Sequence, residues 1–152
     1  MLKAINTLLL SCFNIGFIRF APGTWGSIFG FLFSIFIHMS WPFFFFVFFL
    51  SLYIIKKTVK DIDPQWIVVD EFLGIMLCLL CIKSWIHCVD HIKLYSIGLI
   101  FFRFFDIVKP FPISWIDRIL LSHKKTQALG IIVDDLIAGV MAFGCVLSFV
   151  YY

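Results

Sequence analysis

Long apolar stretches separated by short polar turns make up most of the chain. No charged residue occurs between Phe20 and Ile55, or between Leu136 and Tyr152. Apolar segments fall near residues 25–40, 43–55, 67–85, 93–108 and 131–150. Their lengths approach the ~20 residues that a membrane-spanning helix needs. The pattern therefore predicts an all-α fold, a polytopic membrane helix bundle with about five apolar segments.

Proline and glycine residues divide this pattern further. Residues 4–20 are expected to form an amphipathic or half-inserted helix that ends before Pro22–Gly23. The uncharged stretch after it is too short for two ideal passes, so it forms either two short tilted spans or a re-entrant hairpin. Pro110 and Pro112 end a later helix, and Ile113–Leu121 is expected to be a short interfacial helix.

The composition strengthens the membrane assignment. Hydrophobic residues make up 62% of the 152 residues and charged residues only 14%, and the mean hydropathy is +1.07. These values exclude an ordinary soluble domain. The length fits one domain, so residues 1–152 are expected to form a single integral membrane domain.

The net charge of +3 is explained by topology. If the N-terminus is cytoplasmic, the predicted segments place only Lys83 and Lys93 on the outer side. The cations on the inner side are Lys3, Arg19, Lys56, Lys57, Lys60, Arg103, Lys109, Arg118, Lys124 and Lys125. This asymmetry follows the positive-inside rule, so we expect the bilayer as a partner and no nucleic acid. The sequence leaves the oligomeric state open.

Five carboxylates interrupt or border the apolar segments. They are Asp70, Glu71, Asp106, Asp134 and Asp135. A carboxylate at membrane depth costs at least ~2–3 kcal/mol, and residues of this kind are usually functional. The predicted topology brings all five to the inner ends of their segments, where a divalent cation would offset their mutual repulsion. Oxygen ligands of this type suit Mg²⁺.

Two cations and a helix start accompany the carboxylates. Arg103, Asp106 and Lys109 recur at three-residue spacing, so they are expected to share a broad helix face. The cations suit a phosphate group and the carboxylate suits a metal ion. Thr24 can cap the helix that starts after the first Pro-Gly pair. Asp117, next to Arg118 on the interfacial helix, takes part in either a salt bridge or a lipid head-group contact.

Each feature also has a simpler interpretation. Arg103 with Asp106 alone fits an intramembrane ion pair, and Asp134–Asp135 alone fits a helix N-cap. Buried carboxylates also fit an ion- or proton-coupled small membrane transporter. The convergence of the acidic groups on one leaflet favours a metal-assisted reaction at a phosphoryl group instead. A phospholipid head-group transferase would show a longer acidic motif that the sequence lacks.

Four strings of residues resemble the phosphatidylglycerophosphatase A family, a family of small integral membrane lipid phosphatases. The strings are Pro22-Gly23-Thr24-Trp25-Gly26-Ser27, then Asp63-Pro64 followed by Val68-Val69-Asp70-Glu71-Phe72-Leu73-Gly74, then Phe102-Arg103-Phe104-Phe105-Asp106-Ile107-Val108-Lys109-Pro110-Phe111-Pro112-Ile113, and finally Asp134-Asp135-Leu136-Ile137-Ala138-Gly139. Phe111 stands where the family often has Trp, and the segment before the first string is short. Neither departure removes a charged residue of the site.

The resemblance implies an activity and a set of residue roles. The activity is Mg²⁺-dependent hydrolysis of phosphatidylglycerophosphate to phosphatidylglycerol and phosphate, on the cytoplasmic face of a bacterial inner membrane. The implied metal-binding and catalytic residues are Asp70, Glu71, Asp106, Asp134 and Asp135, and the implied substrate-binding residues are Arg103, Lys109, Thr24 and Gly23. The sequence does not distinguish a base from a nucleophile among the carboxylates. Direct attack by water and a phospho-aspartate intermediate therefore both stay open.

Overall fold

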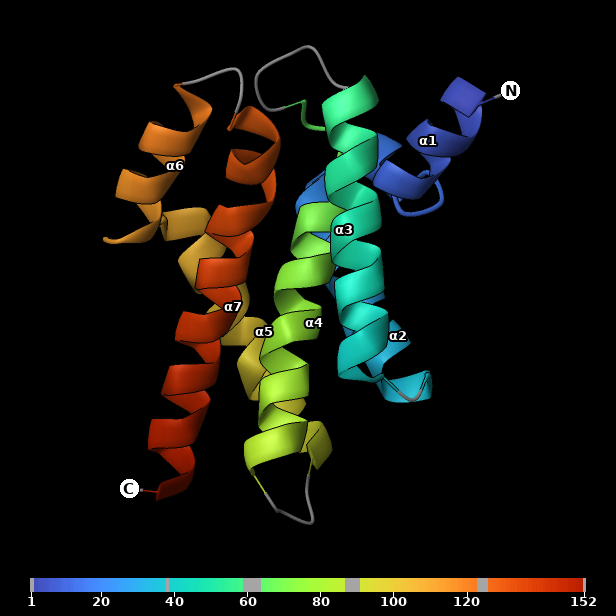
Figure 1. Ribbon diagram of the computed structural model, residues 1–152. Coiled ribbons are helices and arrows are strands. Elements are labelled where there is room, and N and C mark those ends of the chain that lie inside the picture. The colour runs from blue at the N-terminus through green and yellow to red at the C-terminus, as the bar shows by residue number, and fades with distance from the viewer. Residues whose placement is uncertain (1, 38, 59–63, 87–90, 123–125, 152) are drawn as a thin grey trace.

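The regular structure is helical throughout the described part of the chain. The computed structural model describes all residues except 1, 38, 59–63, 87–90, 123–125 and 152 (Figure 1). The helices are α1 (Leu2–Leu10), the 3₁₀ helix η1 (Ile15–Phe17), α2 (Pro22–Phe36), α3 (Trp41–Thr58), α4 (Val69–Trp85), α5 (His91–Val108), α6 (Ile113–Leu121) and α7 (Gln127–Tyr151). The predicted all-α class is confirmed, and Asp63 of the second string lies outside the described residues.

Helix α4 is the centre of the bundle and packs against α2, α3, α5 and α7. Its sequence is apolar on nearly all sides after the first turn, which is typical of a helix surrounded by other helices. Leu73, Ile75 and Met76 are fully buried there. Figure 1 shows α4 and α7 side by side, with α3 on the other side of α4.

Small residues bring α4 and α7 into close contact. A Cβ atom added to Gly74 would lie 2.7 Å from the backbone oxygen of Asp135, and a Cβ on Gly139 would overlap the backbone of Gly74. Glycine at such a crossing lets two helix backbones approach closely. Because Gly74 follows the acidic pair of α4 by one turn, this approach places the carboxylates of both helices beside each other.

Two of the described helices are long and apolar enough to span a bilayer. They are α3 and α7; α2, with 15 residues, is shorter. Its length is ~22 Å, less than the ~30 Å of a hydrocarbon core. Helices α4 and α5 carry charged residues inside the expected apolar segments, among them Glu71 and Arg103. The structure therefore supports a helical bundle with two candidate spans, and the expected count of about five is not confirmed.

One element boundary differs clearly from the sequence expectation. The N-terminal helix ends at Leu10 and not near residue 20, because Cys12, Phe13 and Asn14 have left-handed backbone angles that an α-helix cannot contain. The uncharged stretch forms two separate helices, and Figure 1 shows α2 and α3 running in opposite directions. The short helix Ile113–Leu121 has the expected bounds.

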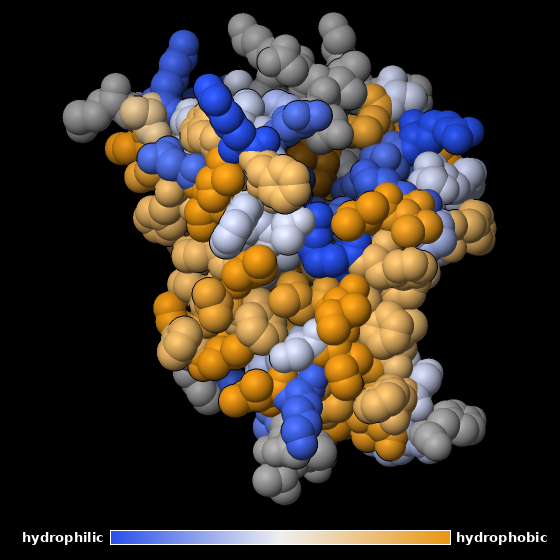
Figure 2. Space-filling model, turned by 180° about the vertical axis from the view of Figure 1, so that it is seen from behind, coloured by the Kyte–Doolittle hydropathy of each residue, from blue (hydrophilic) through white to orange (hydrophobic). Residues whose placement is uncertain are grey.

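Hydrophilic residues gather at one end of the bundle. We call this the site end: it contains the start of α4, the end of α5, α6 and the start of α7, and the N-terminus also lies there, whereas the C-terminus lies at the opposite end (Figure 1). Figure 2 shows hydrophobic side chains over the middle and lower part of one face and hydrophilic side chains mainly in its upper part.

Candidate active site

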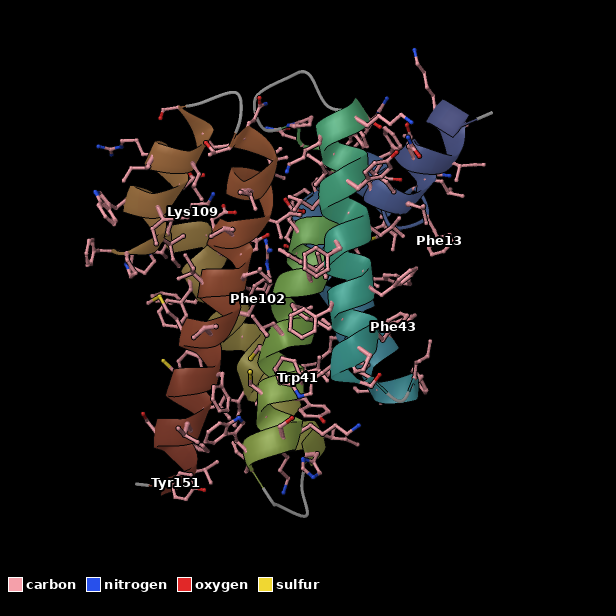
Figure 3. All side chains as sticks on the ribbon, in the orientation of Figure 1. Phe13, Trp41, Phe43, Phe102, Lys109 and Tyr151 are labelled. Carbon is pink, nitrogen blue, oxygen red and sulfur yellow. The ribbon has the colours of Figure 1, made fainter. Side chains whose placement is uncertain are left out.

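A polar cavity of about 320 Å³ opens at the site end, where five helices or their ends meet. Its lining residues are Pro22, Gly23, Gln65, Ile67, Asp70, Glu71, Asp106, Lys109, Asp117, Leu121, Ile131, Asp134 and Asp135. All five carboxylates singled out in the sequence line this one cavity. Figure 3 shows Lys109 in the same upper part of the bundle, far from Tyr151 at the opposite end.

Three of these carboxylates form a tight cluster. Asp70 and Glu71 lie in the first turn of α4 and Asp135 lies in α7, and each offers an oxygen within 4.8 Å of the others. The backbone N–H of Glu71 donates a hydrogen bond of 3.1 Å to Asp70 Oδ1. The position at the start of α4 also places the negative charges near the positive end of the helix dipole, which contributes at most ~1 kcal/mol.

The cluster fits a divalent cation. Asp70 and Asp135 are buried, and the Oε2 atom of Glu71 is buried without a hydrogen-bond partner among the described residues. Buried carboxylates repel one another and keep their charge only when a cation compensates it. Carboxylate oxygens from two helices, with room beside them for water and a phosphate group, are the donor set that Mg²⁺ prefers.

Gly23 allows this cluster to assemble against α2. A Cβ atom added there would overlap the carboxylate of Glu71 and lie 3.5 Å from Nη1 of Arg103. With glycine at this position, the Glu71 carboxylate can lie directly against the first turn of α2, and a larger residue would displace that carboxylate from the cluster. Pro22, the first residue of α2, lines the cavity together with Gly23.

A lysine connects the cluster to the remaining acidic residues. Lys109 Nζ lies 2.6 Å from Asp134 Oδ2 and 3.5 Å from Asp117 Oδ2. Burial lowers the pKa of Lys109, but the charges of Asp134 and Asp117 raise it by more, so the pKa lies above its usual range. Lys109 therefore stays positively charged beside the carboxylates.

The three-residue spacing predicted that Lys109 shares a helix face with Arg103 and Asp106. The structure shows that it does not. Helix α5 ends at Val108, and Lys109 has a left-handed backbone with φ of 43°. The following residue, Pro110, disfavours the right-handed helical region for the residue before it. This turn directs the lysine towards Asp134 of α7, away from α5.

Arg103 connects Asp106, its neighbour on α5, to the first turns of α2. Nη1 of Arg103 is ion-paired with Oδ2 of Asp106, one turn along α5. The same Nη1 donates a 3.2 Å hydrogen bond to Ser27 Oγ, and Nη2 donates a 3.2 Å hydrogen bond to Thr24 Oγ1. The Thr24 hydroxyl, expected at a phosphate, therefore contacts Arg103.

The sequence missed some residues of this region. Ser27 was named in the first string but given no role, although it lies one turn after Thr24, a spacing that places both hydroxyls on one side of α2. Gln65 was also missed, and nothing in its local sequence indicates a site. For Asp117 the sequence left two interpretations open, a salt bridge or a lipid head-group contact. In the structure its carboxylate forms an ion pair with Lys109.

Comparison with known proteins agrees with this geometry. The sequence model of the family described as phosphatidylglycerophosphatase A matches residues 8–150. No solved structure gives a significant match to the chain.

Two curated relatives cover most of the chain. The chain is 35% identical over 165 residues to a phosphatidylglycerophosphatase A from Haemophilus influenzae, and the match covers 100% of this chain and 92% of the relative. It is 30% identical over 145 residues to the phosphatidylglycerophosphatase A of Escherichia coli, and that match covers 90% of this chain and 78% of the relative. The chain therefore belongs to the phosphatidylglycerophosphatase A family of phosphatases.

Proposed function

We propose that this protein is a Mg²⁺-dependent lipid phosphatase that hydrolyses phosphatidylglycerophosphate to phosphatidylglycerol and phosphate. The observation that carries the proposal is the cluster of Asp70, Glu71 and Asp135 oxygens within 4.8 Å of one another. It lies in a cavity that also holds a lysine, in a chain whose relatives are named phosphatidylglycerophosphatases. Cation and anion groups in one cavity suit a phosphomonoester with its metal ion.

The residues that would hold Mg²⁺ are Asp70, Glu71 and Asp135, with Asp106 and Asp134 as further candidates on the same cavity wall. When bound, the ion supplies positive charge that polarises the phosphoryl group and favours attack by water. The other chemical tasks belong to side chains of this chain.

The cations Lys109 and Arg103 supply the site's own positive charge. Lys109 lines the cavity and can donate to phosphoryl oxygens, whose negative charge it neutralises as the reaction proceeds. Asp106 accepts the proton of the attacking water. The new bond joins the water oxygen to phosphorus, and the bond from phosphorus to the glycerol oxygen breaks. That oxygen takes a proton from solvent water and leaves as the alcohol of phosphatidylglycerol, and Asp106 then returns its proton to solvent.

The proposal places the protein in the bacterial inner (cytoplasmic) membrane as a single multi-pass domain. The candidate spans α3 and α7 support the membrane location. The site end faces the cytoplasm in this proposal, because the described cations Lys56 and Lys57 at the end of α3 and Arg118 on α6 lie there. A lipid phosphate at the cytoplasmic surface then lies level with the cavity.

The test is reconstitution of the purified protein with phosphatidylglycerophosphate, followed by measurement of released phosphate with and without Mg²⁺. The proposal predicts release that depends on Mg²⁺, and no release from an Asp106→Asn variant that still inserts into the membrane. The alternative, an ion- or proton-coupled transporter that uses the buried carboxylates, predicts no release under any condition. Family membership does not favour that alternative.

A further inference from the structure

Both terminal nitrogen atoms of Arg103 contact other side chains of the protein. Its Nη1 contacts Asp106 and Ser27, and its Nη2 contacts Thr24. Its Nε atom is buried and has no partner among the described residues. A buried guanidinium is stable only with partners of this kind, because losing hydration costs more than one ion pair returns.

The cavity is lined by Asp106 but not by Arg103. The arginine lies behind the aspartate, between α5 and the first turns of α2. Lys109 differs in both respects: it lines the cavity, and its side chain is 34% exposed, compared with 18% for Arg103. The two cations are therefore not equivalent with respect to a ligand in the cavity.

We infer that Arg103 is a positioning residue, which holds Asp106 in place because its other contacts, to Thr24 and Ser27, fix the guanidinium; we call these three contacts of Arg103 the clasp. We also infer that Lys109 is the cation that contacts the substrate phosphate. The inference rests on the proposed phosphatase function and divides its two cations by task. It also gives Ser27 a role: the hydroxyl accepts from Arg103 while it donates to the backbone oxygen of Gly23 at 2.9 Å. The clasp thus connects Asp106 to the glycine that adjoins the carboxylate cluster.

Lys109 reaches a phosphate by exchanging one partner for another. Asp134 and Asp117 hold its ammonium group at the cavity wall, and the longer 3.5 Å contact to Asp117 is the weaker of the two. A phosphate oxygen can take the place of the Asp117 carboxylate without removing the lysine from Asp134. This keeps the cation charged and directed while the substrate enters.

The first test removes single hydroxyl groups from α2. Ser27→Ala and Thr24→Val each remove one acceptor of Arg103, and Ser34→Ala is the matched control. Ser34 lies two turns after Ser27 and likewise donates to the backbone oxygen four residues earlier, at 2.6 Å, but it has no contact with Arg103. We expect kcat for phosphatidylglycerophosphate to fall roughly tenfold in the first two variants, the effect of losing a charged hydrogen bond, and to stay unchanged in the control.

The second test measures inhibition by inorganic phosphate, which reports the cation that contacts phosphate. Lys109→Gln should raise the inhibition constant at least ~10-fold, whereas Arg103→Lys and Ser27→Ala should leave it within about twofold of wild type. Lys56→Gln, which removes an exposed cation on α3, is the control for net charge. If the Arg103 and Ser27 variants raise the inhibition constant as Lys109→Gln does, Arg103 contacts phosphate and the inference is wrong.

The third test separates positioning from general loss of structure. In an Arg103→Ala variant, added guanidinium should restore part of kcat, and adding Ser27→Ala should cause no further loss, because the serine affects Asp106 only through the arginine and its bond to Gly23 has a counterpart in the Ser34 control. The inference is contradicted if guanidinium does not restore kcat in Arg103→Ala and if the losses of kcat from Arg103→Ala and Ser27→Ala are additive. If Arg103→Ala fails to fold, kcat and phosphate inhibition of the Thr24 and Ser27 variants still test whether Arg103 positions Asp106. A wild-type protein that releases no phosphate overturns the proposed function and this inference with it, whereas an active wild type with raised inhibition constants overturns the inference alone.

Discussion

Lys109 Nζ lies 2.6 Å from Asp134 Oδ2, so the residue that follows α5 is ion-paired with α7. Asp134 is buried, and its Oδ1 atom has no hydrogen-bond partner among the described residues. The pair holds the turn after α5 against α7 at the edge of the carboxylate cluster. It therefore contributes to stability as well as to the charge of the cavity.

Removing the lysine should destabilise the protein, and removing both partners should restore much of the loss. Lys109→Gln leaves the buried Asp134 without its cation, which should lower the free energy of unfolding by roughly 2 kcal/mol, less than for a fully buried pair because the lysine is partly exposed. Asp134→Asn combined with Lys109→Gln removes the uncompensated charge. Denaturant unfolding of the detergent-solubilised variants measures both. A double variant less stable than Lys109→Gln would contradict this account.

The close crossing of α4 and α7 gives a second prediction. Gly74→Ala places a methyl group 2.7 Å from the backbone oxygen of Asp135 and 2.6 Å from Phe102, so α7 or the ring must move. Overpacking of this kind costs about 1–3 kcal/mol. Because Asp135 belongs to the carboxylate cluster, phosphatase activity should fall together with the thermal midpoint.

Gly144→Ala is the control for this variant. Gly144 lies in α7 too, but a Cβ atom there has nothing within 4 Å. Within a helix, alanine is more stable than glycine by about 0.5–1 kcal/mol. This variant should therefore be at least as stable as wild type and fully active. Equal losses in Gly74→Ala and Gly144→Ala would show that the crossing does not set the position of the cluster.

The sequence predicted the elements of this fold better than their ends. The apolar pattern located five of the helices, and two prolines located α6, because burial and proline chemistry act locally. The end of α1 could not be predicted in the same way. Cys12 and Phe13 adopt left-handed angles that neither residue prefers, and only tertiary contacts, such as that of Gly16 with the backbone of Trp66, explain such a turn.

The residues of the candidate site were also predicted better than their partners. Helical spacing and topology brought the five carboxylates into one cavity. Spacing could not show that Thr24 faces Arg103, because that contact depends on how α2 packs against α5. Nor could it show that Lys109 leaves the helix face, because a left-handed residue before Pro110 breaks the periodicity on which the prediction depended.

The carboxylate cluster predicts metal binding that can be measured apart from activity. Glu71→Gln removes a charge and a ligand from the set formed with Asp70 and Asp135. We expect the affinity for Mn²⁺, followed by electron paramagnetic resonance as a stand-in for Mg²⁺, to fall more than ~10-fold, since the loss of even an indirect partner of a metal costs that much. Chelator should abolish wild-type activity and Mg²⁺ should restore it. Unchanged Mn²⁺ affinity in Glu71→Gln would exclude that residue as a ligand.

The two ends of the bundle should be labelled from opposite sides of the membrane. Arg118 on α6 and Trp85 at the end of α4 are both exposed and lie at the site end and the opposite end, respectively. Each is changed to cysteine in a variant whose native cysteines are replaced by serine. A membrane-impermeant maleimide should label Trp85→Cys in spheroplasts and Arg118→Cys only in inside-out vesicles, because the basic end of a membrane protein stays in the cytoplasm.

The labelling result also bears on substrate access. Phosphate release by the cysteine-free parent is the control that the altered protein still folds. If Arg118→Cys is labelled in intact spheroplasts, the cavity with Lys109 faces outwards, and a phosphatase acting on cytoplasmic-leaflet lipid would not reach its substrate. Labelling of both positions from the same side would mean that α4 does not cross the bilayer. In that case the proposed multi-pass topology would be wrong, whereas the carboxylates would still be buried beside one another within the bundle and would still favour a bound cation.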